Sequence, residues 1–161
     1  MFFLRRHINL SLPELLICFA FVMSLFFIEK AILKNRRSKK RKQIAMKEIE
    51  QIETENNISL PELYRAFYYR CSFSAPLKLV GTDLRNRNPE LNKWALELLK
   101  EDRLKNFLDK DDFVFMMHQG YIFWYFKANG DSDPIVFGYH EGRSKPDNLG
   151  PISIFLKEYM L

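Results

Sequence analysis

The chain has 161 residues, a net charge of +5, 15% aromatic residues and two cysteines. Residues 1–47 carry eleven Lys and Arg against two Glu, a net charge of +9, whereas residues 48–161 carry fourteen against eighteen Asp and Glu, a net charge of −4. A mildly acidic body argues against a domain that binds phosphate backbones, and two cysteines cannot form a disulfide framework. The length allows one ordinary domain and one additional segment.

The pentapeptide SLPEL occurs at 11–15 and again at 59–63, and it predicts the start of a helix at both places. The serine hydroxyl can cap a free backbone N–H, the glutamate three residues later completes a capping box, and proline fits the first helical turn. The residues that follow the two copies differ. We therefore interpret the pair as one local capping device and not as a structural repeat.

Residues 12–33 are expected to form an N-terminal transmembrane helix. Leu15 to Ile28 contain no charged residue, and a helix over 12–33 would be about 33 Å long, against a hydrocarbon core of about 30 Å. A cleaved secretory signal is the first alternative, but no small-residue cleavage site follows; a buried helix of a soluble protein is the second. We expect a single-pass anchor in the cell membrane, preceded by a short non-cytoplasmic tail at 1–11.

A polybasic juxtamembrane linker is expected at 34–43. The heavier positive charge lies after the apolar helix, because only Arg5, Arg6 and the terminal amine precede it, so the positive-inside rule predicts a cytoplasmic body. A nucleic-acid or nuclear-targeting patch is the alternative. Six side chains in the linker are expected to contact anionic lipids, namely Arg36, Arg37, Lys39, Lys40, Arg41 and Lys42.

Residues 44–161 predict an α+β domain in which helices flank an antiparallel β-sheet. Hydrophobic periodicity predicts helices at 43–55, directly after the second SLPEL, at 89–102 and at 152–160. Strand signals lie at 77–83, 113–117, 121–127 and 135–140. Gly120 falls in a short hairpin loop where a positive φ is required. A loop rich in Gly and Pro is expected at 141–151.

Strand 121–127 is apolar on both faces, so either helices cover both faces or one face is an aromatic surface for a partner. We choose Tyr121, Phe123 and Tyr125 as the open face, because a tyrosine hydroxyl tolerates water. Their neighbours are assigned to the core, namely Ile122, Trp124 and Phe126. The open face would bind a basic partner together with an acidic cluster upstream, namely Asp109, Asp111 and Asp112. The loop at 141–147 is a second candidate place for such binding.

No catalytic or cofactor motif is visible. The sequence contains no CxxC, HExxH, GxSxG, P-loop or GxGxxG pattern, which are the patterns that would indicate zinc, nucleophilic or nucleotide chemistry. Cys71 is expected to be a buried or half-buried thiol. We therefore expect no enzyme activity, no metal and no cofactor; a membrane-associated hydrolase with an unrecognised site is a remaining alternative.

The order of several segments is similar to the SUKH superfamily, which includes yeast regulators of cell-wall synthesis and bacterial immunity proteins. These segments are IEQIE, NISLPELYRAFY, PLKLVGTDLRNRNPELNKWALELLKED, FVFMMHQGYIFWYF and ISIFLKEYM, and they lie within 44–161. The resemblance implies a non-catalytic α+β module that neutralises a toxin by occluding it. The N-terminal anchor departs from the usual soluble member.

The expected function is therefore that of a membrane-anchored immunity protein. Its partner would be a protein, such as a polymorphic or contact-dependent toxin, and no nucleic acid is expected to bind. The alternative is a membrane-tethered regulatory or scaffold protein of the same fold without a toxin partner. No contact residues follow from the resemblance, because toxin contacts vary among its members.

Overall fold

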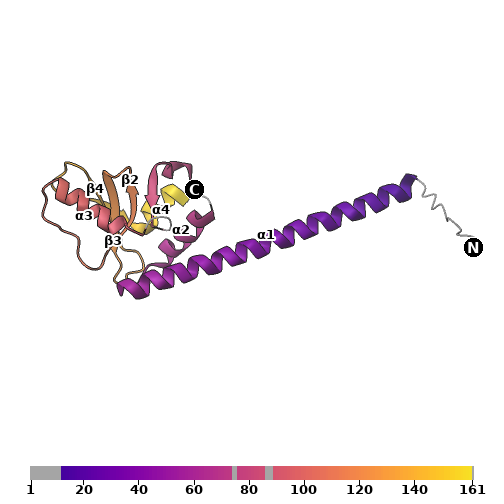
Figure 1. The fold of residues 1–161 in the computed structure, drawn as a ribbon, viewed down its shortest axis with the longest axis horizontal. Coiled ribbons are helices and arrows are strands. Elements are labelled where there is room, and N and C mark those ends of the chain that lie inside the picture. Colours follow the sequence, from indigo (N-terminus) through magenta and orange to yellow (C-terminus); the bar gives the residue numbers. More distant parts are fainter. Residues whose placement is uncertain (1–11, 74–75, 86–88, 161) are drawn as a thin grey trace, which may run out of the picture. The chain divides into compact units, whose positions relative to one another are not determined.

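The computed structural model describes residues 12–73, 76–85 and 89–160 (Figure 1). The chain divides into two compact units, residues 1–40 and residues 41–161. The expected tail at 1–11 lies outside the described residues. Within the part of the chain that is described, no helix is both long enough and apolar enough to span a bilayer.

Helix α1 runs from Leu12 to Asn56 without interruption. The residues expected to form a polybasic linker, 34–43, are helical and continue α1, because Lys, Arg and Gln favour helix and no Gly or Pro occurs from Glu14 to Leu60. The helix ends where predicted, and Asn57 follows with φ 51° in the left-handed region. Several side chains of the expected span, at 12–15, 17, 18 and 22, lie outside the description, so the span stays a prediction.

Helix α2, Glu62–Phe73, runs antiparallel to the part of α1 that belongs to the second unit. The Arg65 guanidinium donates to both oxygens of the Glu53 carboxylate at 2.6 Å, and Glu53 Oε1 also accepts from the Leu60 amide at 2.6 Å. Three contacts step along the two helices in opposite directions: Glu53 with Arg65, Glu48 with the Tyr68 hydroxyl, and Arg41 over the Phe73 ring.

The predicted capping box at the second SLPEL is wrong. The Ser59 amide donates to the carbonyl oxygen of Ala128 at 2.9 Å, so it is not available to Glu62. The first helical bond of α2 runs from the Arg65 amide to the carbonyl oxygen of Pro61 at 3.1 Å. A long-range backbone contact therefore replaces the local cap. The Ser11 of the first copy lies outside the described residues.

Five strands form one antiparallel sheet in the order β1-β2-β3-β4-β5, which confirms the α+β class and the meander. The strands are β1 Thr82–Leu84, β2 Asp112–His118, β3 Ile122–Lys127, β4 Ile135–His140 and β5 Asp147–Pro151. The expected strand at 77–83 is instead a 3₁₀ helix, η1 Leu77–Leu79, followed by β1. The loop expected at 141–151 from its Gly and Pro residues is wrong over its last five residues, which form β5.

Helices cover both faces of the sheet (Figure 1). The first core contains residues of the end of α1, of α2 and of α4, Ile152–Met160, packed on Phe115 and Phe126. The second core contains residues of α3, Leu91–Glu101, packed on Phe123 and Tyr139. A β-bulge in β2 places the neighbours Phe115 and Met116 in the same core, so strict alternation fails there.

The β2–β3 hairpin forms as the sequence predicts. The Tyr121 amide donates to the carbonyl oxygen of His118 at 3.2 Å, and both central residues are left-handed, Gln119 with φ 49° and Gly120 with φ 86°. This is the turn type that matches the twist of two antiparallel strands. It places Gly120 and Tyr121 at the end of the sheet.

Candidate binding surfaces

The predicted open face of β3 is covered. Phe123 is 0% exposed and Tyr125 is 6% exposed, and of the three chosen residues only Tyr121, at 39%, reaches solvent. The prediction that Phe123 and Tyr125 lie on an open face is therefore wrong. Helix α3 and the segment after it cover that face, and the Phe107 ring packs 6.2 Å from Tyr125 between ring centres.

The opposite side of β3 agrees better with the sequence. Phe126 is fully buried, as predicted, whereas Ile122 and Trp124 are half-buried. The Trp124 ring packs 6.4 Å from that of Phe155. It also lies against Gly138 on the neighbouring strand, where an added Cβ would come within 3.2 Å of the indole. A side chain at Gly138 would therefore force the Leu149 side chain to shift, because its Cδ1 would lie 2.9 Å from the added Cβ, and would press on the Trp124 ring.

The acidic cluster before β2 is only partly available to a partner. Asp112 is 5% exposed, so its assignment to a solvated surface is wrong: its Oδ2 accepts from the Asp109 amide at 2.8 Å. Lys127 Nζ lies 2.9 Å from Asp109 Oδ2 and 3.3 Å from Asp112 Oδ1. The Lys127 ammonium lowers the pKa of the Asp109 carboxyl. Lys127 thus offsets one of the three negative charges of the cluster, while Asp111 is half-buried.

The six basic side chains expected to contact lipid are all exposed on α1: Arg36, Arg37, Lys39, Lys40, Arg41 and Lys42. Arg41, the first residue of the second unit, also lies over the Phe73 ring at 5.1 Å. Lipid contact by these residues stays a prediction.

An acidic pocket that the sequence reasoning missed lies between α3 and the β2–β3 turn. It has a volume of about 270 Å³, and it is lined by Trp94, Glu97, Leu98, Glu101, Met117 and Gly120. Glu97 and Glu101 are exposed, and neither is in an ion pair or a side-chain hydrogen bond with the described residues. Like charges four residues apart cost a helix about 0.2–0.5 kcal/mol. The fold gains nothing visible from this pair of carboxylates.

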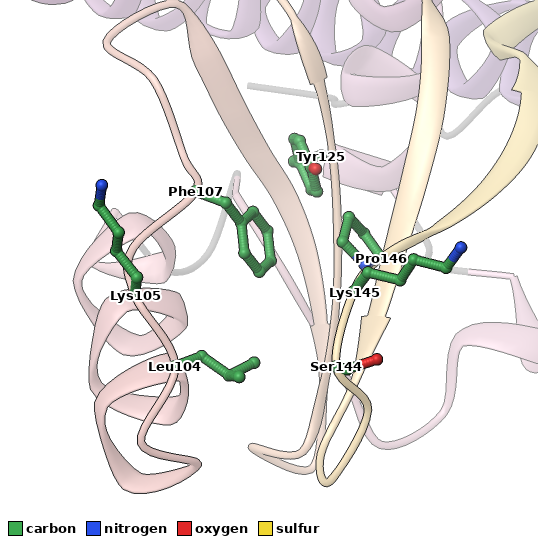
Figure 2. Close-up of a pocket in the computed structure, with 7 residues that line it drawn as sticks. All are labelled: Leu104, Lys105, Phe107, Tyr125, Ser144, Lys145 and Pro146. Carbon is green, nitrogen blue, oxygen red and sulfur yellow. The ribbon is translucent and has the colours of Figure 1, made fainter.

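A second and larger cleft, of about 440 Å³, lies between the segment after α3 and the loop before β5 (Figure 2). Leu104, Phe107, Tyr125 and Pro146 form its apolar wall, and Lys105 and Lys145 extend away from it on opposite sides. Burial raises the pKa of the Tyr125 hydroxyl to about 12, and the charges of Asp112 and Asp109 act in the same direction. Tyr125 is therefore a neutral group in this cleft at physiological pH.

The Asp102 carboxylate joins the two sides of this cleft. Its Oδ2 accepts from the Tyr139 hydroxyl of β4 and from the Gly142 amide at 2.9 Å. Helix α3 ends directly before it in a Schellman motif: the Arg103 amide donates to Lys100 and the Leu104 amide to Leu99. Arg103 takes the left-handed position with φ 59°, where glycine is usual. This turn directs the chain from α3 to the cleft.

Among the described residues, the remaining Cys, His, Asp and Glu side chains form no evident metal site. Cys71 is buried, as expected. In residues 12–73, 76–85 and 89–160, no three His, Cys, Asp or Glu side chains are arranged to hold a metal ion. No family model, curated protein or solved structure matches the chain. The expected absence of catalysis therefore stays a prediction.

Proposed function

We propose that this chain is a membrane-anchored, non-catalytic protein-binding module that takes a basic partner at the acidic pocket. The observation that carries the proposal is a pair of carboxylates, Glu97 and Glu101, that have no ion-pair partner among the described residues and lie beside the half-buried Trp94. Interface hot spots combine an aromatic anchor with charges that become paired on binding. A partner's cation would remove the like-charge repulsion that the free helix retains.

The dimensions of the pocket suit one Arg or Lys side chain of such a partner. A guanidinium could bind two carboxylates and also lie over an indole ring, and both interactions strengthen when water is excluded. Tyr121, exposed at the same end of the sheet, could extend the contact. This is the aromatic and acidic combination expected from the sequence, at a different place.

The first specific form of the proposal is an immunity protein that neutralises a cognate toxin by direct binding. A toxin that acts on nucleic acid carries basic residues at its active surface, and an acidic pocket that binds one of them would occlude it. The resemblance to the SUKH superfamily supports the same function. The second form is a membrane-tethered regulatory or scaffold protein that uses the pocket for a partner other than a toxin.

Replacing Glu97 and Glu101 together with Gln should weaken partner binding about tenfold or more, because charged hydrogen bonds are lost. Thermal stability should stay unchanged or rise slightly, because the repulsion is removed. The measurement is a titration of the full chain with a basic partner protein that the wild-type chain binds, with melting temperatures of each variant. The matched control is Glu158→Gln, an exposed glutamate on α4. Unchanged affinity of the double variant would refute the pocket as the binding site.

A protection assay separates the two forms of the proposal. Cells that express the toxin should survive with the wild-type chain and should lose protection with the double Gln variant. If binding is lost in the titration but the wild-type chain never protects cells, the regulatory form is favoured over the immunity form.

We also propose that residues 12–33 cross the membrane once and that the second unit is cytoplasmic. The support is the uncharged run Leu15–Ile28, followed by the six basic residues from Arg36 to Lys42. A reporter that is active only outside the cytoplasm should be silent when fused after Leu161 and active when fused before Met1. Replacing the six basic residues with Asn should make part of the C-terminal fusion active. If the C-terminal fusion of the wild-type chain is active, the second unit lies outside the cytoplasm and the proposed topology is wrong.

A further inference from the structure

The cleft of Figure 2 carries a charge pattern that is independent of the acidic pocket. Each of its two loops contains an Arg-x-Lys triplet, Arg103-Leu104-Lys105 on one side and Arg143-Ser144-Lys145 on the other. All four cations are exposed. None of them is in an ion pair with a described residue.

The fold holds the two triplets side by side. The Asp102 carboxylate accepts a hydrogen bond from the Gly142 amide at 2.9 Å. Arg103 directly follows Asp102, and Arg143 directly follows Gly142, so this bond holds the starts of the two triplets together. The Tyr139 hydroxyl, which donates to Asp102, also lies 3.1 Å from the carbonyl oxygen of Arg143. Lys105 and Lys145 thus lie on adjacent segments at the rims of an apolar wall, and Arg103 and Arg143 belong to the same two segments. An anionic ligand would lower the electrostatic energy of this arrangement.

We propose that this cleft binds a peptide segment of a partner in which one large apolar side chain is flanked by carboxylates. The apolar side chain would pack against Leu104, Phe107 and Pro146, and the carboxylates would reach Lys105 and Lys145 at the rims. A volume of about 440 Å³ accommodates one aromatic or leucine side chain with its flanking backbone. This site has the opposite charge to the acidic pocket, so the inference does not rest on the proposed basic partner.

A peptide fits better than a nucleic acid. A single strand needs a basic groove that follows its backbone over several nucleotides, whereas the two lysines that line this cleft are confined to its rims.

The test is fluorescence anisotropy of the full chain in uncharged detergent micelles. The probe is a labelled peptide with one Phe between two Asp-Glu pairs; the comparison probes are its Phe→Ala version and labelled oligo-thymidine. We expect the Phe peptide to bind saturably, more weakly at higher salt, and at least tenfold more tightly than the Ala peptide. Equal binding of the two peptides, or tighter binding of the oligonucleotide, would overturn the proposal.

Charge-reversal variants locate the site. Lys105→Glu and Lys145→Glu should each weaken peptide binding at least fivefold, whereas Lys157→Glu on α4, an exposed lysine with the same charge change, should leave it unchanged. The Glu97→Gln, Glu101→Gln double variant should bind the peptide as the wild-type chain does, which separates this site from the acidic pocket. Melting temperatures check that each variant is folded. An equal effect of Lys157→Glu would show that the contact is nonspecific.

Discussion

Replacing Tyr64 with Ala should destabilise the second unit by about 3–5 kcal/mol, the usual cost of removing a buried aromatic ring. Tyr64 is 1% exposed. It lies at the centre of an aromatic cluster, with ring centres 6.2 Å or less from those of Phe67, Tyr68, Phe113, Phe115 and Phe126. A domain is stable by only about 5–15 kcal/mol, so the loss should remove a large part of its stability.

Two variants make this experiment decisive. Tyr64→Phe keeps the ring and its edge contacts, so it should lose far less stability than Tyr64→Ala. Leu77→Ala removes a side chain that is 88% exposed and should change stability by less than about 0.5 kcal/mol. The measurement is denaturant unfolding of the full chain in detergent, followed by circular dichroism. A Tyr64→Ala protein as stable as Leu77→Ala would mean that α2 does not pack on the sheet as described.

The elements with a clear period could be predicted from the sequence. Strands β2, β3 and β4 alternate or run apolar between turn residues, and α3 and α4 show helical spacing. Gly120 predicted the hairpin turn from the sequence, and its φ of 86° in the structure is one that favours glycine. Strand β5 could not be predicted, because it is held by backbone pairing to β4 and not by an apolar face of its own.

The covered face of β3 shows where sequence reasoning ends. The alternation showed that both faces are apolar, but not that Leu104, Phe107 and Leu108 fold back over Tyr125. The hydroxyl of Tyr125 suggested that this residue is exposed. Its burial depends instead on the segment around Phe107, about twenty residues earlier in the chain. Similarly, Asp112 looked like a loop residue, although its carboxylate is bound by an amide and an ammonium group.

The two candidate sites differ in how far they could be predicted from the sequence. Trp94, Glu97 and Glu101 follow one another at helical spacing, so their common face could have been found from the sequence. The two Arg-x-Lys triplets are separated by about forty residues, and long-range contacts bring them together: Asp102 with Tyr139 and Gly142, and Tyr139 with the Arg143 carbonyl oxygen. Nothing local in either triplet indicates the other.

Alkaline pH should unfold the second unit steeply, because four of its tyrosines are buried. Burial is the largest cause that raises the pKa of each one above the usual 10. The nearby carboxylate of Glu48 adds to the rise for Tyr68, and that of Asp102 adds to it for Tyr139. The pKa of Tyr64 is raised as well, and that of Tyr125 is raised to about 12. All four side chains are at most 6% exposed.

Between pH 10 and about 12 these tyrosines therefore lose their protons in the unfolded chain but keep them in the folded one. The unfolded state then binds fewer protons, so the free energy of unfolding falls as pH rises, by about 1.4 kcal/mol per pH unit for each tyrosine. Below pH 10 their contribution is fully present. Denaturant midpoints measured from pH 8 to 12, with tyrosinate absorbance, should show unfolding and ionisation together. Tyr125→Phe should make the slope shallower, and a flat stability above pH 10 would contradict the prediction.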